Sequence, residues 1–93
     1  MIDFKHKVIL KESVFAQQVD DEMVLLDMDS ENYFGLDSVG SAIWGAMQEH
    51  DTIQEVFDTL LEEYDVEPEV LQKDLFDFIT KLEQNQLIKV EKL

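Results

Sequence analysis

The spacing of the hydrophobic residues changes near residue 37, and this change is the strongest constraint on how the chain can fold. Before it, apolar residues alternate in short runs, a pattern typical of strands. After it, they recur every three or four residues, which is typical of amphipathic helices. The chain has 93 residues, enough for one hydrophobic core. The sequence therefore predicts one α+β domain over residues 1–93, with its strands first and its helices second.

Three short strands are expected in the first half, at residues 14–19, 23–28 and 32–36. The acidic segments 20–22 and 29–31 separate them and are short enough for hairpin turns. The expected product is a small antiparallel meander. Residues 1–12 are ambiguous, because the apolar residues 8–10 between lysines suit either an extra strand or an arm.

The second half predicts three helices and a closing strand. Asp37 or Ser38 supplies the N-cap of a first helix that ends near His50. Its apolar stripe consists of Val39, Ala42, Ile43, Ala46 and Met47.

Capping signals also mark the other two helices. Thr52 and Glu55 have the spacing of a capping box at the start of a second helix, whose apolar stripe ends at Tyr64. Pro68 suits the first turn of a third helix, and residues 87–90 close the chain as a short strand. This order predicts a winged-helix-like domain, a three-stranded antiparallel sheet followed by three helices.

The charge of the chain excludes several classes of function. Asp and Glu number 22 against seven lysines and no arginine, for a formal net charge of −15. Nucleic-acid binding needs cations that displace counterions from phosphates, and an anionic membrane surface attracts basic segments, so neither is an expected partner. No cysteine is present, which removes disulfides, thiolate nucleophiles and Cys-based metal sites. Because the start of the chain lacks the apolar stretch of a signal peptide, we expect a cytoplasmic protein.

Catalytic chemistry has little support in the sequence. The two histidines are His6, in the ambiguous arm, and His50, at a helix end. The carboxylates are spread over solvated faces, and no calcium loop, glycine-rich phosphate loop or nucleophile elbow occurs. We therefore expect no enzyme activity, no metal and no cofactor.

Two non-enzymatic alternatives stay open at this point. Residues 35–39, Gly-Leu-Asp-Ser-Val, resemble the site at which acyl carrier proteins carry a phosphopantetheine arm, which would make Ser38 the modified residue. Against this, the residues before Ser38 are expected to form strands, and Asp37 and Ser38 suit a helix cap. The other alternative is a helical regulatory module that binds only protein.

Residues 33–44, YFGLDSVGSAIW, carry a more specific resemblance. Together with residues 52–56, 63–66 and 74–78 and with the apolar residues at 82, 87 and 88, they resemble the PqqD family. Its members are small winged-helix-like domains, also called RiPP recognition elements, that hold the leader of a ribosomally made precursor peptide. The aromatic-Gly-Leu-Asp stretch is more similar to the stand-alone members of lasso-peptide clusters than to the pyrroloquinoline quinone member.

The resemblance implies a binding site at the edge of the third strand. The leader would add there as an antiparallel strand, in the cleft against the third helix, and an unpaired edge has the N–H and C=O groups for this. Asp74 and Asp77 are available for a leader lysine or arginine, whereas the apolar members are also typical of a core. The candidate peptide-binding residues are Asn32, Tyr33, Phe34, Gly35, Leu71, Asp74, Leu75, Asp77 and Phe78.

The implied partners are the precursor leader peptide and a maturation enzyme, either a leader peptidase or a radical SAM protein. Trp44 and Phe76 lie off the apolar stripes, so they are either packed against the sheet or exposed for such an enzyme. The residues leave open whether the domain acts alone or as a homodimer through its exposed edge.

Overall fold

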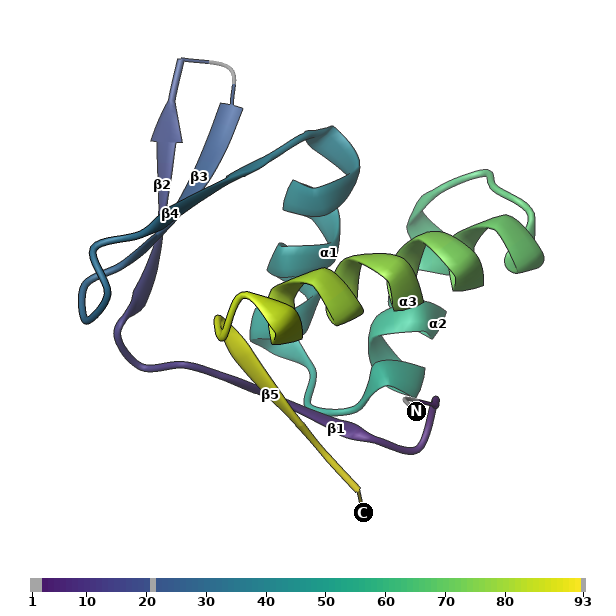
Figure 1. Ribbon diagram of the computed structural model, residues 1–93. Coiled ribbons are helices and arrows are strands. Elements are labelled where there is room, and N and C mark those ends of the chain that lie inside the picture. The colour runs from purple at the N-terminus through teal and green to yellow at the C-terminus, as the bar shows by residue number, and fades with distance from the viewer. Residues whose placement is uncertain (1–2, 21, 93) are drawn as a thin grey trace.

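The computed structural model describes residues 3–20 and 22–92 and consists of two sheets and three helices (Figure 1). The strands are β1 (Lys7–Leu10), β2 (Val14–Val19), β3 (Glu22–Asp27), β4 (Tyr33–Leu36) and β5 (Ile88–Glu91), and the helices are α1 (Ser38–Glu49), α2 (Ile53–Glu63) and α3 (Pro68–Gln84). The predicted three-stranded antiparallel sheet followed by three helices is confirmed, within a residue or two at each boundary. In the described part of the chain, no helix is long and apolar enough to cross a membrane.

The strands β2, β3 and β4 form the expected meander, with β3 in the centre. Leu25 of β3 lies opposite both Ala16 and Phe34, and Met23 lies opposite Leu36. These residues face the helices, since Leu25 and Leu36 are buried there. Alternation places the remaining side chains of the sheet on the outer face.

The helices pack on the inner face of this sheet and on one another. α1 contacts α2, β3 and β4, and α2 contacts α3. The core draws on every helix and also includes residues of β1, β3, β4 and β5. Trp44 belongs to it with 3% of its surface exposed, so this residue is packed and not free for a partner.

The prediction that Val39 and Tyr64 belong to the buried stripes of their helices is wrong. Val39 is 51% exposed and Tyr64 is 48% exposed, although both follow the helical spacing of buried residues. Each lies at a helix end, where the facing element stops, so the apolar face has nothing to pack against. The buried face of α1 instead includes Gly40 and Trp44.

Residues 3–10 are both an arm and a strand. Phe4 lies between Phe57 of α2 and Phe76 of α3, with ring centroids 4.9 and 5.1 Å away. The Ile53 and Gln54 amides, which begin α2 and have no acceptor within it, donate to the arm's carbonyl oxygens at His6 and Phe4. β1 then pairs with β5 in a separate two-stranded ribbon. Of the segment 1–12 that the sequence leaves ambiguous, the described part thus holds an arm followed by the strand β1.

A buried carboxylate joins this ribbon to the meander. Asp27 is 2% exposed and accepts hydrogen bonds from Lys11 Nζ at 2.9 Å, Ser13 Oγ at 2.8 Å, Ser30 Oγ at 3.0 Å and the Asp29 amide at 3.1 Å. These donors hold the pKa of Asp27 well below its usual range, and the pKa of Lys11 is raised in turn. The turn that precedes β4 is fixed by this cluster.

Candidate peptide-binding edge

The strand β4 forms one edge of the meander and ends at a helix cap. Asp37 is extended, and its Oδ1 accepts the Gly40 amide at 2.7 Å, so the strand stops and α1 begins within one residue. Asp37, and not Ser38, is thus the N-cap. Ser38 is the first residue of α1 and follows a three-stranded sheet, so the structure gives no support to a carrier protein armed at Ser38.

The register shows which backbone groups of β4 face outward. The Asp27 amide donates to the Asn32 carbonyl at 2.9 Å, which makes this a hydrogen-bonded pair. In an antiparallel ladder such pairs alternate with pairs that do not exchange hydrogen bonds, so Phe34 and Leu36 face β3. The N–H and C=O groups of Tyr33 and Gly35 therefore point away from the sheet, toward the open edge.

Neither the arm nor the ribbon covers this edge. The arm runs along the start of α2, and β1 pairs with β5. Among the described residues, β4 pairs with β3 alone. The edge that the sequence predicts for a foreign strand is thus present, and no described segment of the chain occupies it.

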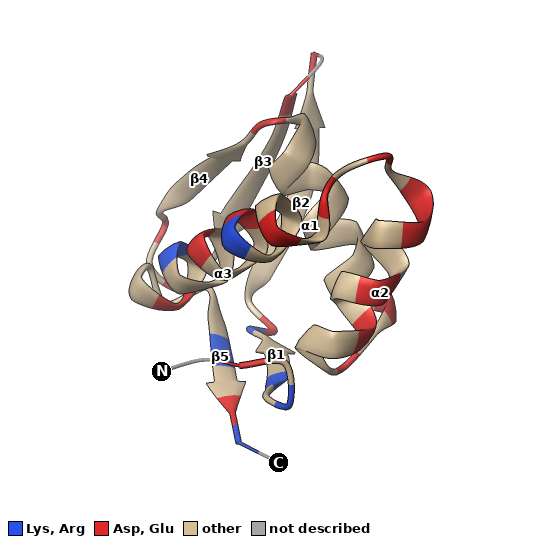
Figure 2. Ribbon diagram, turned by 90° about the vertical axis from the view of Figure 1, so that its right-hand side faces the viewer, with Lys and Arg blue, Asp and Glu red and all other residues tan. Residues whose placement is uncertain are grey.

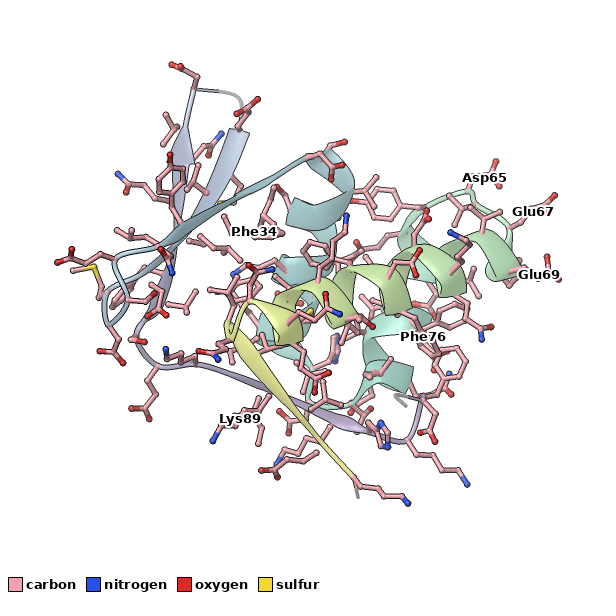
Figure 3. All side chains as sticks on the ribbon, in the orientation of Figure 1. Phe34, Asp65, Glu67, Glu69, Phe76 and Lys89 are labelled. Atoms are coloured by element: carbon pink, nitrogen blue, oxygen red, sulfur yellow. The ribbon has the colours of Figure 1, made fainter. Side chains whose placement is uncertain are left out.

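The four predicted residues of this edge have different surroundings. Asn32 and Tyr33 are exposed, Tyr33 to 77%. Gly35 is also exposed, and a Cβ added to it would meet no atom within 4 Å. Phe34 is half-buried on the side of β4 that faces the helices (Figure 3).

The predicted residues of α3 divide into buried and exposed ones. Leu75 has no exposed surface and Leu71 has 7%, so these two side chains belong mainly to the core. Phe78 is half-buried, and the position of a Cβ added to Gly40 would be 3.0 Å from its Cε1. Phe78 thus packs on the first turn of α1, beside the end of β4.

The two acidic candidates lie on different surfaces. Asp74 lines an apolar hollow between the helices. Asp77 lines another hollow, with Phe76 and His6, and its Oδ2 accepts Lys73 Nζ at 3.0 Å, which raises the pKa of Lys73. The structure therefore brings Asp74, and not Asp77, to the end of β4.

This hollow has a volume of about 320 Å³, and sequence reasoning did not identify it as part of the site. Ser38 and Val39, which directly follow β4 and its cap, form one wall, and the C-terminal end of α2 and the N-terminal end of α3 form the others. Val66 and Val70, apolar residues that fall outside the predicted stripes, were the available signal in the sequence. The lining residues are Ser38, Val39, Ile43, Leu60, Tyr64, Val66, Val70, Leu71 and Asp74.

A larger hollow, of about 1020 Å³, lies over the β1–β5 ribbon. Six of its twelve lining residues are charged, and it is far less apolar than the hollow beside β4. Apolar pockets with a few polar groups are the usual form of a binding site, so the smaller hollow is the better candidate.

Acidic side chains surround the candidate site. Figure 2 shows Lys only on α3 and around the β1–β5 ribbon, with none on the meander. Asp65 and Glu67 in the loop before α3 and Glu69 in the first turn of this helix lie next to the hollow (Figure 3). A segment with lysine or arginine would therefore be attracted to this surface.

Comparisons with known proteins agree with this geometry. The sequence model of the family described as "Coenzyme PQQ synthesis protein D (PqqD)" matches residues 22–88. The solved structure of TbiB1 in complex with the TbiA(beta) leader peptide is 36% identical, and the match covers 87% of this chain and 94% of that one with a TM-score of 0.77. A lasso peptide synthetase B1 complexed with the leader peptide is 27% identical, with coverage of 88% and 96% and a TM-score of 0.76. No curated protein matches the chain in a sequence search.

Proposed function

The chain belongs to the PqqD family, and from this premise we propose that it is a non-catalytic adaptor that binds the leader of a ribosomally made precursor peptide. Both solved relatives are complexes with a leader peptide. The observation that carries the proposal is the open edge of β4 beside an apolar hollow. Since a ribosomal precursor arises in the cytoplasm, we place this step there.

The leader adds to β4 as an antiparallel strand. All pairs in this sheet are antiparallel, and the outward N–H and C=O groups of Tyr33 and Gly35 offer four hydrogen bonds to an added strand. At about 0.5–1.5 kcal/mol each, these bonds give affinity without sequence selectivity. Selectivity therefore rests with side chains.

The hollow beside β4 supplies that selectivity. An antiparallel leader strand starts at the Leu36 end of β4, so residues just N-terminal to the strand reach the hollow. Its apolar walls suit an aliphatic or aromatic side chain. Asp74 at its lining favours a lysine or arginine close to that side chain.

Hydrogen exchange tests the proposal directly. The probe is a synthetic peptide, the TbiA(beta) leader, and a leader encoded beside this gene is a second probe where such a reading frame is found. On binding, the amides of Tyr33 and Gly35 should exchange more slowly, because they gain acceptors. The amides of Ala16 and Gln18, which point outward at the opposite edge on β2, serve as matched controls and should keep their rates. Protection of the β2 amides, or of neither pair, would refute strand addition at β4.

The bound precursor is then delivered to a maturation enzyme. Tyr33, Gly35 and Asp74 can hold a peptide, and no hydrogen bond joins a hydroxyl to a base among the described residues that line the hollow. We therefore assign the chemistry to a partner, a leader peptidase or a radical SAM protein. Loss of precursor processing on removal of this chain, with restoration on its return, is the expected result.

A further inference from the structure

The exposed large hydrophobic side chains of the described residues fall into two groups. One group, Val39, Tyr64, Val66 and Val70, lines the hollow already assigned to the leader. The other group belongs to the meander and is not explained by that hollow. Its members are Phe15, Val19, Met28 and Tyr33.

The second group shares one face of the sheet. Phe15 lies opposite Leu26, and Leu26 lies opposite Tyr33, so the three strands form one apolar row. Val24 lies beside this row on β3, on the same face. Phe15 is 58% exposed and Tyr33 is 77% exposed, although cross-strand neighbours normally shield one another. We call this surface the outer face.

The helices leave the outer face uncovered. Leu25 and Phe34 on the inner face pack on the core, and Figure 1 places all three helices on that side. Contiguous exposed apolar surface on a small domain is typical of an interaction site. The open edge of β4 does not account for Phe15 and Val19, because both are on β2 at the far side of the sheet.

Charge decides which occupant fits. Exposed Asp20 lies at one turn beside the outer face, and exposed Asp29 and Glu31 lie at the other. Glu22 lies on the outer face itself, opposite Val19. Residues 12–36 contain seven acidic residues and no lysine or arginine. A second copy would place the same acidic turns against these and be repelled, whereas a protein with an apolar patch framed by lysine and arginine would be attracted.

We propose that the outer face docks the maturation enzyme, through an apolar patch on that enzyme framed by basic side chains. The identity of the partner rests on the proposed adaptor function, whereas the location of the docking face rests on the exposed apolar side chains of the sheet. The leader would then occupy the hollow and the backbone edge of β4, and the enzyme would contact the side chains of the outer face, with Tyr33 at the border between the two surfaces. One small domain could hold both at once.

The test measures enzyme and leader binding separately. The leader peptidase or radical SAM protein that processes the precursor is purified and titrated onto the full chain, with and without the leader peptide, at about 50 and about 300 mM salt. Phe15→Ser and Val19→Ser remove exposed apolar side chains of the outer face, and Val70→Ser is the matched control from the hollow. All three positions are exposed, so thermal melts should show a retained fold.

Phe15→Ser should weaken enzyme binding about tenfold or more, as truncation of an interface aromatic does, and leave leader affinity unchanged. Val70→Ser should weaken leader binding and leave enzyme binding unchanged. Enzyme binding by the original chain should be weaker at the higher salt concentration. The docking proposal is overturned if the enzyme does not bind or binds Phe15→Ser and Val19→Ser as well as the original chain. It is also overturned if the variants only dissociate a dimer of this chain. Failure of the leader to bind, with enzyme docking intact, would count against the adaptor function alone.

Discussion

A proline at Gly35 should abolish much of the leader affinity while the fold is kept. The N–H of this residue points out of the sheet, so its removal breaks no bond to β3. Proline is tolerated on edge strands where the missing donor faces solvent. Gly35 has no positive φ, and a Cβ there meets no atom within 4 Å. The change therefore acts on the open edge and leaves the core untouched.

The expected loss follows from one hydrogen bond. A leader carbonyl that faces the proline is buried without a donor, which costs about 1–3 kcal/mol. That corresponds to a decrease in affinity of about 5- to 150-fold. Fluorescence anisotropy with labelled leader peptide measures it, and urea unfolding checks that stability is retained.

Two controls separate the edge from general effects of proline. Gly35→Ala keeps the N–H and should bind the leader as the original chain does. Gln18→Pro removes an outward N–H from the opposite edge on β2 and should also bind normally. If folded Gly35→Pro binds the leader with unchanged affinity, the assignment of the β4 edge is wrong.

Three further changes test the fold and the site. Asp27→Asn should remove an acid-sensitive part of stability, because the lowered pKa of Asp27 stabilises the folded state above about pH 4 and this contribution is lost gradually as the pH falls toward the pKa of the folded state. The difference between the urea midpoints of the original chain and the variant should therefore shrink steadily from about pH 4 to about pH 2, and a constant difference would contradict this. Asp37→Ala should lower the free energy of unfolding by about 1 kcal/mol through loss of the cap, whereas Ser38→Ala should change it by less than about 0.5 kcal/mol in the same urea titrations; equal effects would argue against Asp37 as the cap. Asp74→Ala should weaken the binding of a leader that has a lysine or arginine next to the apolar residue that enters the hollow. Fluorescence anisotropy measures this, and an unchanged affinity would show that Asp74 is not part of the site.

The order of the elements could be predicted because it depends on local pattern. A period of two or of three to four residues follows from strand and helix geometry, and the caps at Asp37 and Thr52 depend on neighbours three residues away. The edge of β4 followed from the same pattern, since a three-stranded meander leaves its last strand unpaired on one side. These features needed no knowledge of distant contacts.

Features that join distant segments could not be predicted in this way. Asp27 lies on the inner face of a strand, and nothing in its neighbourhood indicates that Lys11 and Ser13 will supply its hydrogen bonds. The pairing of β1 with β5 joins the two ends of the described chain. Helical spacing included Val39 and Tyr64 in the apolar stripes, but it cannot show where the facing helix ends. The hollow arises at that end, so sequence reasoning missed it.

The acidic charge of the chain determines which partners can reach the open edges of the sheet. Unpaired strand edges and an exposed apolar face favour pairing between copies of a chain. Among the described residues, β2 and β4 each pair on one side alone, and the outer face lies between these two edges. At a net charge of −15, two copies repel each other before these surfaces meet. A segment or protein rich in lysine and arginine experiences the opposite force, so the same charge that opposes self-association favours a basic leader and a basic docking partner.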